Sequence, residues 1–193
     1  MQIRSTLLPG VVLIELAVHR DARGYFLETW QARRYQEMLE LNTPFVQHNQ
    51  SYSGHGVLRG LHYQRRQAQG KLVRVVQGRV FDVAVDVRVA SPTFGRWFGI
   101  TLSGIDAGSS DAVHQQLWIP PGFAHGFQVL SGHALVEYMC TDFYAPEDEH
   151  CLSWNDPDVG IDWPLAQPVL SERDASGKRL RDLRDADELP SLE

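Results

Sequence analysis

Residues 80–89 read VFDVAVDVRV and carry the clearest structural pattern of the chain. Every odd-numbered position is apolar, beginning with Phe81, whereas the even-numbered positions include Asp82, Asp86 and Arg88. Side chains that alternate with a period of two predict a β-strand with two different faces. This segment is therefore expected to be a strand.

Short apolar or β-branched runs recur along the rest of the chain, and turn residues separate nearly all of them. They are Val11–Val18, Phe45–Gln50, Gly56–His62, Leu72–Gln77, Trp97–Leu102, Gln116–Ile119, Gly126–Leu130 and Ala134–Cys140. Many short strands with Gly and Pro between them favour an antiparallel sandwich or barrel over βαβ units. We therefore predict a mostly β fold of the jelly-roll kind.

The length of 193 residues fits one domain and is sufficient to bury a core, so we expect a single domain over residues 1–193. The window Gln31–Leu41 has apolar residues at helical spacing and predicts a surface helix. The C-terminal stretch Asp174–Glu193 mixes charges with a few leucines and predicts a short helix or tail. The polar segment Ser103–Gln115 is expected to be a long hairpin connection.

The charge balance is acidic, with 18 Lys and Arg against 24 Asp and Glu, a formal net charge of −6. Because a protein that binds a phosphate backbone needs a basic surface, we do not expect nucleic acid as a partner. Cys140 and Cys151 are too few for a disulfide framework and are interpreted as reduced thiols of a cytoplasmic protein. The apolar run Leu7–Val18 is interrupted by Pro9 and Glu15. No stretch approaches the roughly 20 apolar residues of a membrane span, so we expect a soluble protein without membrane contact.

Two segments resemble the halves of the cupin barrel signature. In the first, Gly56 is followed by His62, but Gln64 stands where metal-binding cupins have a second histidine, and no glutamate follows at the expected distance. The second segment, PPGFAH at residues 120–125, reproduces the Pro-x-Gly-x-x-His half. Two histidines are too few for a transition-metal centre, because three protein ligands are the norm. We therefore expect a cupin-like barrel of antiparallel strands without a metal.

Without a metal, His62 remains available as a proton carrier, because imidazole titrates near neutral pH. Most histidines are simply hydrogen-bonded or exposed, so the residue alone does not decide between a structural and a catalytic role. Arg59, Lys71 and Arg74 add cations on neighbouring strands of an acidic protein. Such cations are costly in a barrel interior unless a carboxylate or another anion accompanies them.

The stretch GVLRGLHYQ at residues 56–64, followed by QGKLVR at residues 69–74, resembles the dTDP-4-dehydrorhamnose 3,5-epimerases of rhamnose synthesis. Further blocks resemble the same family in the same order, namely Asp21–Gly24, Phe81–Asp86, Ser91–Gly95, Leu117–Pro120, Gly122–Phe127, Trp154–Pro157 and Ile161–Pro164. The resemblance extends from about Pro9 to Asp174, nearly the whole chain.

The resemblance implies that the protein inverts C3 and C5 of dTDP-4-dehydro-6-deoxy-D-glucose, whose C4 ketone acidifies the hydrogens on both carbons. It implies no redox or metal cofactor. His62 would be the base that removes the proton, and Asp174 would accept a hydrogen bond from its other nitrogen. Lys71 would stabilise the negative charge that develops on the C4 oxygen. Tyr138 would return a proton from the opposite face.

The resemblance also implies positions that hold the nucleotide diphosphate and the sugar. They are Arg23, Phe26, Glu28, Gln47, Asn49, Arg59, His125, Tyr144, Glu149 and Arg173. Arg23 and Arg59 offer forked guanidinium donors to a diphosphate. Phe26 and Tyr144 offer flat faces to a thymine ring. By the same analogy we expect a homodimer in which an N-terminal strand crosses to the partner.

Some positions depart from the usual pattern of the family, chiefly the long Ser103–Gln115 connection and the residues Gln50 and Tyr52 beside Asn49. The four implied catalytic residues are intact, but the sequence does not decide which carbons are inverted. Relatives in antibiotic-sugar pathways keep these residues and invert one carbon, or act on an altered deoxysugar. A 5-epimerase or 3-epimerase of a related dTDP-4-keto-deoxysugar is therefore the alternative.

Two other classes of function remain open. A metal-dependent cupin enzyme, such as a dioxygenase or isomerase, needs a third ligand near His62 and His125, and Gln64 argues against it. A non-catalytic module that binds a sugar nucleotide is expected to lack at least one of the four catalytic residues. All four are present.

Overall fold

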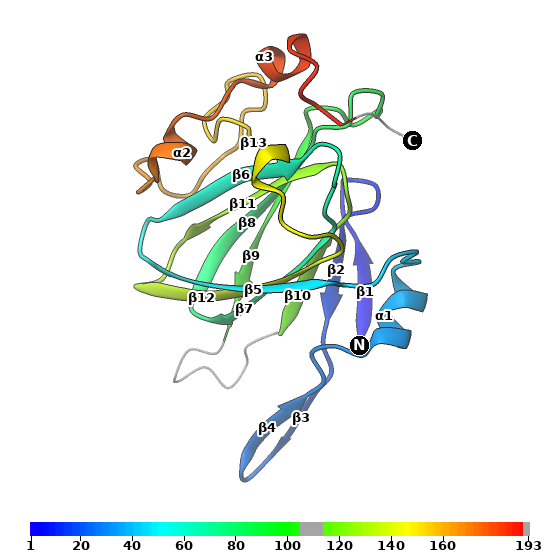
Figure 1. The fold of residues 1–193 in the computed structure, drawn as a ribbon. Coiled ribbons are helices and arrows are strands. Elements are labelled where there is room, and N and C mark those ends of the chain that lie inside the picture. The colour runs from blue at the N-terminus through cyan, green and yellow to red at the C-terminus, as the bar shows by residue number, and fades with distance from the viewer. Residues whose placement is uncertain (105–113, 191–193) are drawn as a thin grey trace.

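The structure is a computed structural model that describes residues 1–104 and 114–190 (Figure 1). Two antiparallel sheets pack face to face as an open barrel, and a two-stranded hairpin projects from one end. The helices of the described residues are short and lie outside the sheets. The predicted mostly β jelly-roll fold is therefore confirmed.

The first sheet has six strands in the order β1-β2-β10-β7-β12-β5. Their bounds are β1 Gln2–Ser5, β2 Val12–Glu15, β10 Gln115–Ile119, β7 Lys71–Gln77, β12 His133–Cys140 and β5 Gln47–Gly54. The second sheet has five strands in the order β13-β6-β11-β8-β9. Their bounds are β13 Glu149–Cys151, β6 Leu58–Gln64, β11 Phe123–Val129, β8 Arg79–Asp86 and β9 Trp97–Ser103. Most predicted runs therefore coincide with strands to within a few residues.

Strand β8 lies between β11 and β9, and both of its faces are buried. Val80 and Ala84 belong to the core between the two sheets. Val83 and Val85 face the other way, into a second core that includes Leu183 from the C-terminal segment. The two faces read from the alternation are thus confirmed, and each of them meets a separate core.

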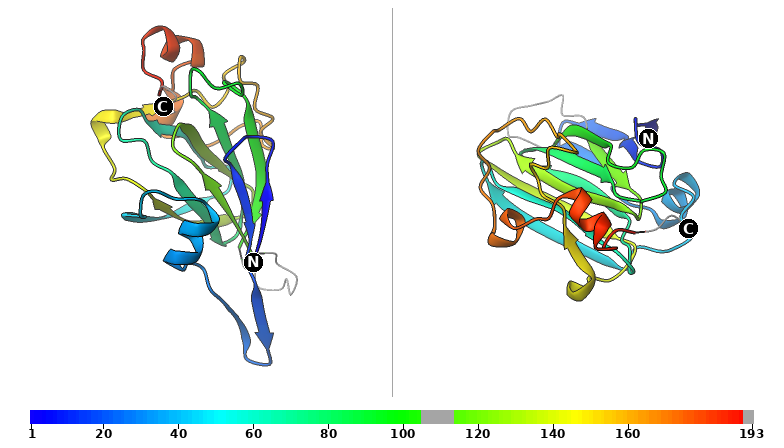
Figure 2. Two further views of the ribbon diagram at one scale, coloured as in Figure 1. Left: turned by 90° about the vertical axis from the view of Figure 1, so that its right-hand side faces the viewer. Right: turned by 90° about the horizontal axis from the view of Figure 1, so that it is seen from above.

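The C-terminal segment contains two short helices, α2 (Glu172–Ala175) and α3 (Leu180–Asp185), where a single short helix or tail is predicted. Leu180, Leu183 and Leu189 are buried against the outward face of the second sheet. This packing holds the segment at the end of the molecule where β6 and β13 lie (Figures 1 and 2).

The predicted surface helix is present as α1, which spans Ala32–Met38 and ends before the predicted Leu41. Its amino end is capped by Gln31, whose side chain accepts a hydrogen bond from the backbone N–H of Arg34. Tyr35 is fully buried in a third cluster against the first sheet. The helix therefore covers part of the outer face of that sheet.

The predicted run Val11–Val18 is not one strand. It divides into β2 and the first residue of a separate hairpin, formed by β3 (Val18–Asp21) and β4 (Gly24–Leu27). Gly24 follows the tight turn with φ of 130°, in the region that favours glycine. Figure 1 and the left view of Figure 2 show the hairpin extending away from the two sheets.

Residues 105–113 of the predicted connection Ser103–Gln115 lie outside the described residues, whereas Ser103 ends β9 and Gln115 begins β10. No helix in residues 1–104 or 114–190 is long and apolar enough to cross a membrane.

Candidate active site

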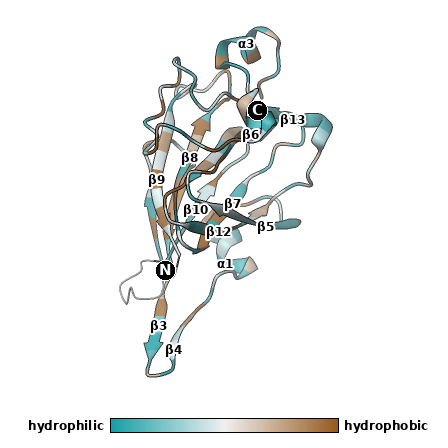
Figure 3. Ribbon diagram, turned by 90° about the vertical axis from the view of Figure 1, so that its left-hand side faces the viewer, coloured by the Kyte–Doolittle hydropathy of each residue, from teal (hydrophilic) through white to brown (hydrophobic). Residues whose placement is uncertain are grey.

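A cavity of about 690 Å³ opens between the two sheets, at the end where the C-terminal segment crosses. Most of the side chains singled out in the sequence line it, namely Gln47, Asn49, Arg59, His62, Lys71, His125, Tyr138, Tyr144, Glu149, Arg173 and Asp174. Strand β5, which is hydrophilic along its length (Figure 3), supplies one wall. The fold therefore brings residues that are up to 127 positions apart, from Gln47 to Asp174, into one site.

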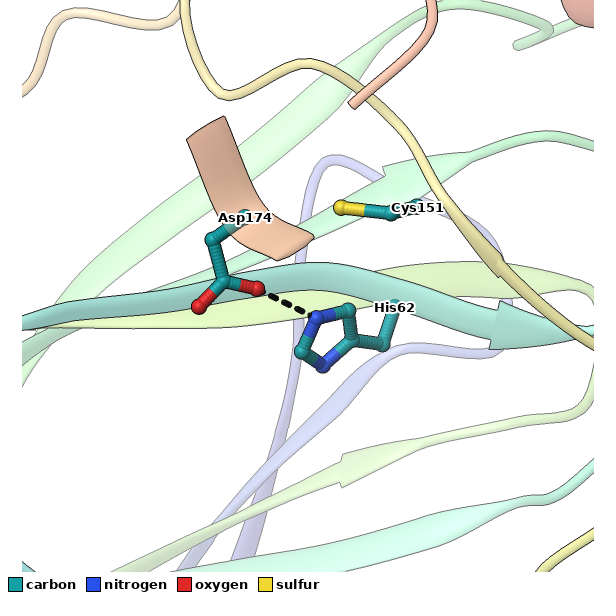
Figure 4. Close-up of side chains that lie close together, drawn as sticks. All are labelled: His62, Cys151 and Asp174. Carbon is teal, nitrogen blue, oxygen red and sulfur yellow. Dashed lines mark hydrogen bonds and ion pairs between the residues drawn. The ribbon is translucent and has the colours of Figure 1, made fainter. Parts of the chain in front are cut away.

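His62 and Asp174 form a close pair in this cavity. The His62 Nε2–H donates to Asp174 Oδ1 at 2.6 Å (Figure 4). The other ring nitrogen, Nδ1, lies 3.9 Å from Glu149 Oε1. Because the carboxylate holds the proton on Nε2, the lone pair of neutral His62 is on Nδ1. The pair can therefore accept a proton and stabilise the imidazolium that results.

Asp174 is kept ionised by the donors around it. Burial opposes its charge, but hydrogen bonds from His62 and Ser171 outweigh this and hold the pKa of Asp174 below its ordinary value. Ser171 Oγ donates to Oδ2 at 2.8 Å, and the backbone N–H of Gly60 points at Oδ1 from 3.4 Å. Ser171 is also the N-cap of α2, so the start of this helix fixes the carboxylate.

Lys71 and Tyr138 enter the same cavity from β7 and β12 of the facing sheet. Lys71 is buried, and its Nζ donates to the carbonyl oxygen of His62 at 3.3 Å. Burial lowers the pKa of Lys71 and raises that of Tyr138. The lysine ammonium group, a protonated tyrosine hydroxyl and the His62 imidazole thus lie in one cavity.

A second histidine and carboxylate pair lies deeper in the site. His125 Nε2 donates to both carboxylate oxygens of Asp82, at 3.0 and 3.1 Å, and both residues are buried. His125 on β11 is the cross-strand neighbour of His62 on β6. Arg74, by contrast, pairs with Glu137 at 2.6 Å and does not line the cavity.

Arg173 forms the exposed edge of the site. It pairs with Glu149, which also accepts a hydrogen bond from the Tyr144 hydroxyl at 2.9 Å. Arg173 Nη2 lies 3.4 Å from His62 Nε2. A guanidinium, a carboxylate and an aromatic face are therefore grouped at the mouth of the cavity.

A family model described as dTDP-4-dehydrorhamnose 3,5-epimerase matches residues 5–182. The chain belongs to this family. The epimerase of that name from Pseudomonas aeruginosa is 53% identical over 176 residues, which are 91% of this chain and 93% of that protein. The resemblance read from the sequence is therefore confirmed.

Solved structures agree with this family assignment. A dTDP-6-deoxy-D-glucose-3,5-epimerase from Legionella pneumophila, in complex with dTDP-4-keto-L-rhamnose, superposes with a TM-score of 0.92 at 50% identity, covering 100% of this chain and 98% of that one. A 4-keto-6-deoxy sugar epimerase from the novobiocin biosynthetic gene cluster of Streptomyces spheroides gives 0.91 at 36% identity, covering 100% and 94%. The cupin-like fold is thus shared with solved epimerases from two different bacteria.

Three of the positions carried over from the epimerase family lie outside the cavity of this chain. Arg23 and Phe26 are on the β3–β4 hairpin, and Glu28 follows it. Arg23 pairs with Asp21 within the hairpin, and Phe26 is 70% exposed. Within one chain these residues are not brought together with His62.

A larger cavity of about 790 Å³ lies elsewhere on the molecule, beside α3. Phe94, Trp97 and Arg181 contribute to its walls, and Arg181 is paired with Asp158. No histidine is among the described residues that line it. The smaller cavity, which contains the predicted catalytic residues His62, Lys71, Tyr138 and Asp174, is the candidate active site.

Six residues that line the cavity were not predicted as site residues, namely His48, Gln50, Ser51, Gln69, Phe127 and Ser171. Ser51 shares a strand face with Gln47 and Asn49, so the period of two along β5 could have indicated it. Its Oγ is buried and has no hydrogen-bond partner among the described residues. Ser171 begins a Ser-x-x-Asp pattern, which is a helix-start signal.

Proposed function

We propose that the protein is a dTDP-4-dehydrorhamnose 3,5-epimerase that converts dTDP-4-dehydro-6-deoxy-D-glucose into dTDP-4-dehydro-L-rhamnose. The observation that carries this proposal is the 2.6 Å contact between His62 and Asp174 in a cavity that also contains Lys71 and Tyr138. Family membership supplies the substrate class.

In the first step, His62 Nδ1 removes the proton from the carbon next to the C4 ketone. Asp174 stabilises the imidazolium that forms, because its carboxylate accepts the hydrogen bond from Nε2. Negative charge moves onto the C4 oxygen as the C–H bond breaks. Lys71 is the cation available to this oxygen, and its stabilisation is greatest in the transition state.

In the second step, a proton returns to the opposite face of the same carbon, which inverts the centre. Tyr138 is the proposed donor, because its strand belongs to the sheet facing His62. Burial raises its pKa, so the phenol stays protonated until the enolate is present to accept the proton. The same two steps at the other carbon give the doubly inverted product.

We propose that the nucleotide is held by residues of two copies of the chain. Arg59, Tyr144 and Arg173 line the mouth of the cavity within one copy. The β3–β4 hairpin carries an exposed phenylalanine and an arginine away from its own sheets, a shape suited to a partner's site. A homodimer in which each hairpin reaches the other copy would supply Arg23 and Phe26 to that site.

The first experiment follows deuterium entry at C3 and C5 by NMR, with metal-free protein and dTDP-4-dehydro-6-deoxy-D-glucose in heavy water. Entry at both carbons is expected for wild type, and none for His62→Ala, which should still bind nucleotide. Entry at one carbon only would assign the protein to the single-carbon alternative. Unchanged turnover of His62→Ala would remove His62 from the mechanism.

A complementation experiment tests the shared site. His62→Ala and Phe26→Ala are each expected to have low activity, because one lacks the base and the other a nucleotide contact. After the two are unfolded and refolded together, mixed dimers contain one intact site each and should restore up to about a quarter of wild-type activity. No recovery, with dimers present, would contradict the shared site.

A further inference from the structure

Cys151 has no role in the proposed reaction, yet its thiol lies beside the His62–Asp174 pair (Figure 4). On β13 it is the direct cross-strand partner of His62 on β6, and such partners have their side chains on the same face. Helix α2 brings Asp174 to the same place. One ligand atom from each of the three residues lies within 4.8 Å of the other two.

These atoms form a set that suits a thiophilic divalent cation: an imidazole nitrogen, a thiol sulfur and a carboxylate oxygen. Bonds of about 2.0–2.3 Å to Zn²⁺ would separate the ligand atoms by roughly 3.3–3.7 Å in a tetrahedron. His62 Nε2 and Asp174 Oδ1 are closer than this, at 2.6 Å, because a proton joins them. Movements of about 1 Å by the three side chains therefore bring their ligand atoms, now 2.6 to 4.8 Å apart, to the separations that an ion requires.

We propose that His62, Cys151 and Asp174 form an inhibitory binding site for a thiophilic divalent cation such as Zn²⁺. The inhibition rests on the proposed function, whereas the binding of the ion does not. A water molecule would complete the four ligands that Zn²⁺ prefers.

Occupation of the site removes the base by moving one proton. When Nε2 binds the ion, the ring proton moves to Nδ1, and His62 has no lone pair left for the substrate hydrogen. Cys151 gives its proton to water as the sulfur–metal bond forms, and Asp174 is already an anion. One proton is released for each ion bound, and no group is oxidised or reduced.

Two features of the site oppose the ion. Burial raises the pKa of Cys151 to about 12, so the ion must displace a firmly held proton. Arg173 Nη2 lies 3.4 Å from His62 Nε2 and repels a cation there. Its side chain is 53% exposed and paired with Glu149, so it can move outward while keeping its charge in water.

Cobalt(II) is the probe for binding, because a thiolate ligand gives it a charge-transfer band in the near ultraviolet. Metal-free wild type is expected to show this band on addition of Co²⁺, and Cys151→Ser is expected to lack it. Cys140→Ser is the matched control, because Cys140 is a buried free cysteine on another strand and outside the cluster. That variant should keep the band.

Zn²⁺ is then titrated against turnover. Wild type should lose activity and regain it with a chelator, while Cys151→Ser should need at least about tenfold more Zn²⁺ for the same loss. Without Zn²⁺, Cys151→Ser should turn over like wild type. A wild type without the band, a band that survives in Cys151→Ser, or full turnover at saturating Co²⁺ would overturn the proposal. The spectra need no substrate, so a failure of the proposed function is distinguished from a failure of this site.

Discussion

Replacement of Asp174 by asparagine removes one charge from the site and leaves its shape nearly unchanged. The carboxylate accepts hydrogen bonds from His62 at 2.6 Å and from Ser171 at 2.8 Å. An asparagine can keep both contacts, because its oxygen accepts from His62 and its amide can donate to the Ser171 hydroxyl. The tautomer of His62 is then retained. What is lost is the attraction between a carboxylate and the imidazolium formed during proton removal.

The size of this loss follows from Coulomb's law. Charge centres about 4 Å apart, at an effective dielectric constant of about 20, attract each other by about 4 kcal/mol. Since each 1.36 kcal/mol changes a rate about tenfold, kcat of Asp174→Asn should fall by about a thousandfold. KM should change only a few-fold, because the hydrogen bonds of Asp174 run to the protein itself.

The assay measures kcat and KM from deuterium entry at C3 and C5. Asp156→Asn is the control, because Asp156 is also buried and accepts backbone hydrogen bonds from Asp158 and Leu180, but does not line the cavity. Its kcat should stay within about twofold of wild type, whatever its stability. A loss of less than about tenfold in Asp174→Asn, or a loss seen only in KM, would refute the electrostatic role given to the pair.

Three further predictions concern other parts of the molecule. Burial lowers the pKa of Lys71 from 10.5 and raises that of Tyr138 from 10.0, so Lys71 should lose its proton first as the pH rises. Activity should therefore decline at a pH below the ordinary lysine range, and Lys71→Arg should move this decline to higher pH. A decline that Lys71→Arg leaves unchanged would count against Lys71. Tyr138→Phe should spare exchange at C3 more than completion at C5, and equal losses by NMR would contradict its role as acid. Leu183 is 1% exposed, so Leu183→Ala should lower the free energy of unfolding by about 3 kcal/mol and Tm by roughly 6–12 °C, as measured by calorimetry. A shift in Tm under about 2 °C would show that the C-terminal segment adds little to stability.

The strands that the sequence predicts are those with a buried face. The alternation of Val80–Val89 is visible because each side of β8 meets a core. Strand β1 was not predicted, because all four of its residues are exposed at a sheet edge and its sequence therefore shows no alternation of apolar and polar residues. The β3–β4 hairpin was not predicted for the same reason, since its residues are mostly exposed.

The candidate site was predictable only in pieces. His62 stands out through the cupin-like pattern, but its contact with Asp174 joins residues 112 positions apart and cannot be read from spacing. Family resemblance supplied that pairing. Asp82 and His125 lie in different strong patterns, yet only the pairing of β8 with β11 makes them neighbours. Local signals indicate where side chains point, whereas the sheet register decides which of them meet.

Asp174 lies in helix α2, in a C-terminal segment that contributes no strand to either sheet. Beyond α2, this segment is held by buried leucines such as Leu183 and by an isolated bridge between Leu152 and Lys178. Hydrogen bonds from the Ser153 N–H to the Lys178 carbonyl and from the Tyr63 hydroxyl to the Glu188 carbonyl add to these attachments, so the segment and the second sheet share one core. Loss of this shared core on heating separates Asp174 from His62, so turnover is expected to be lost together with the folded barrel.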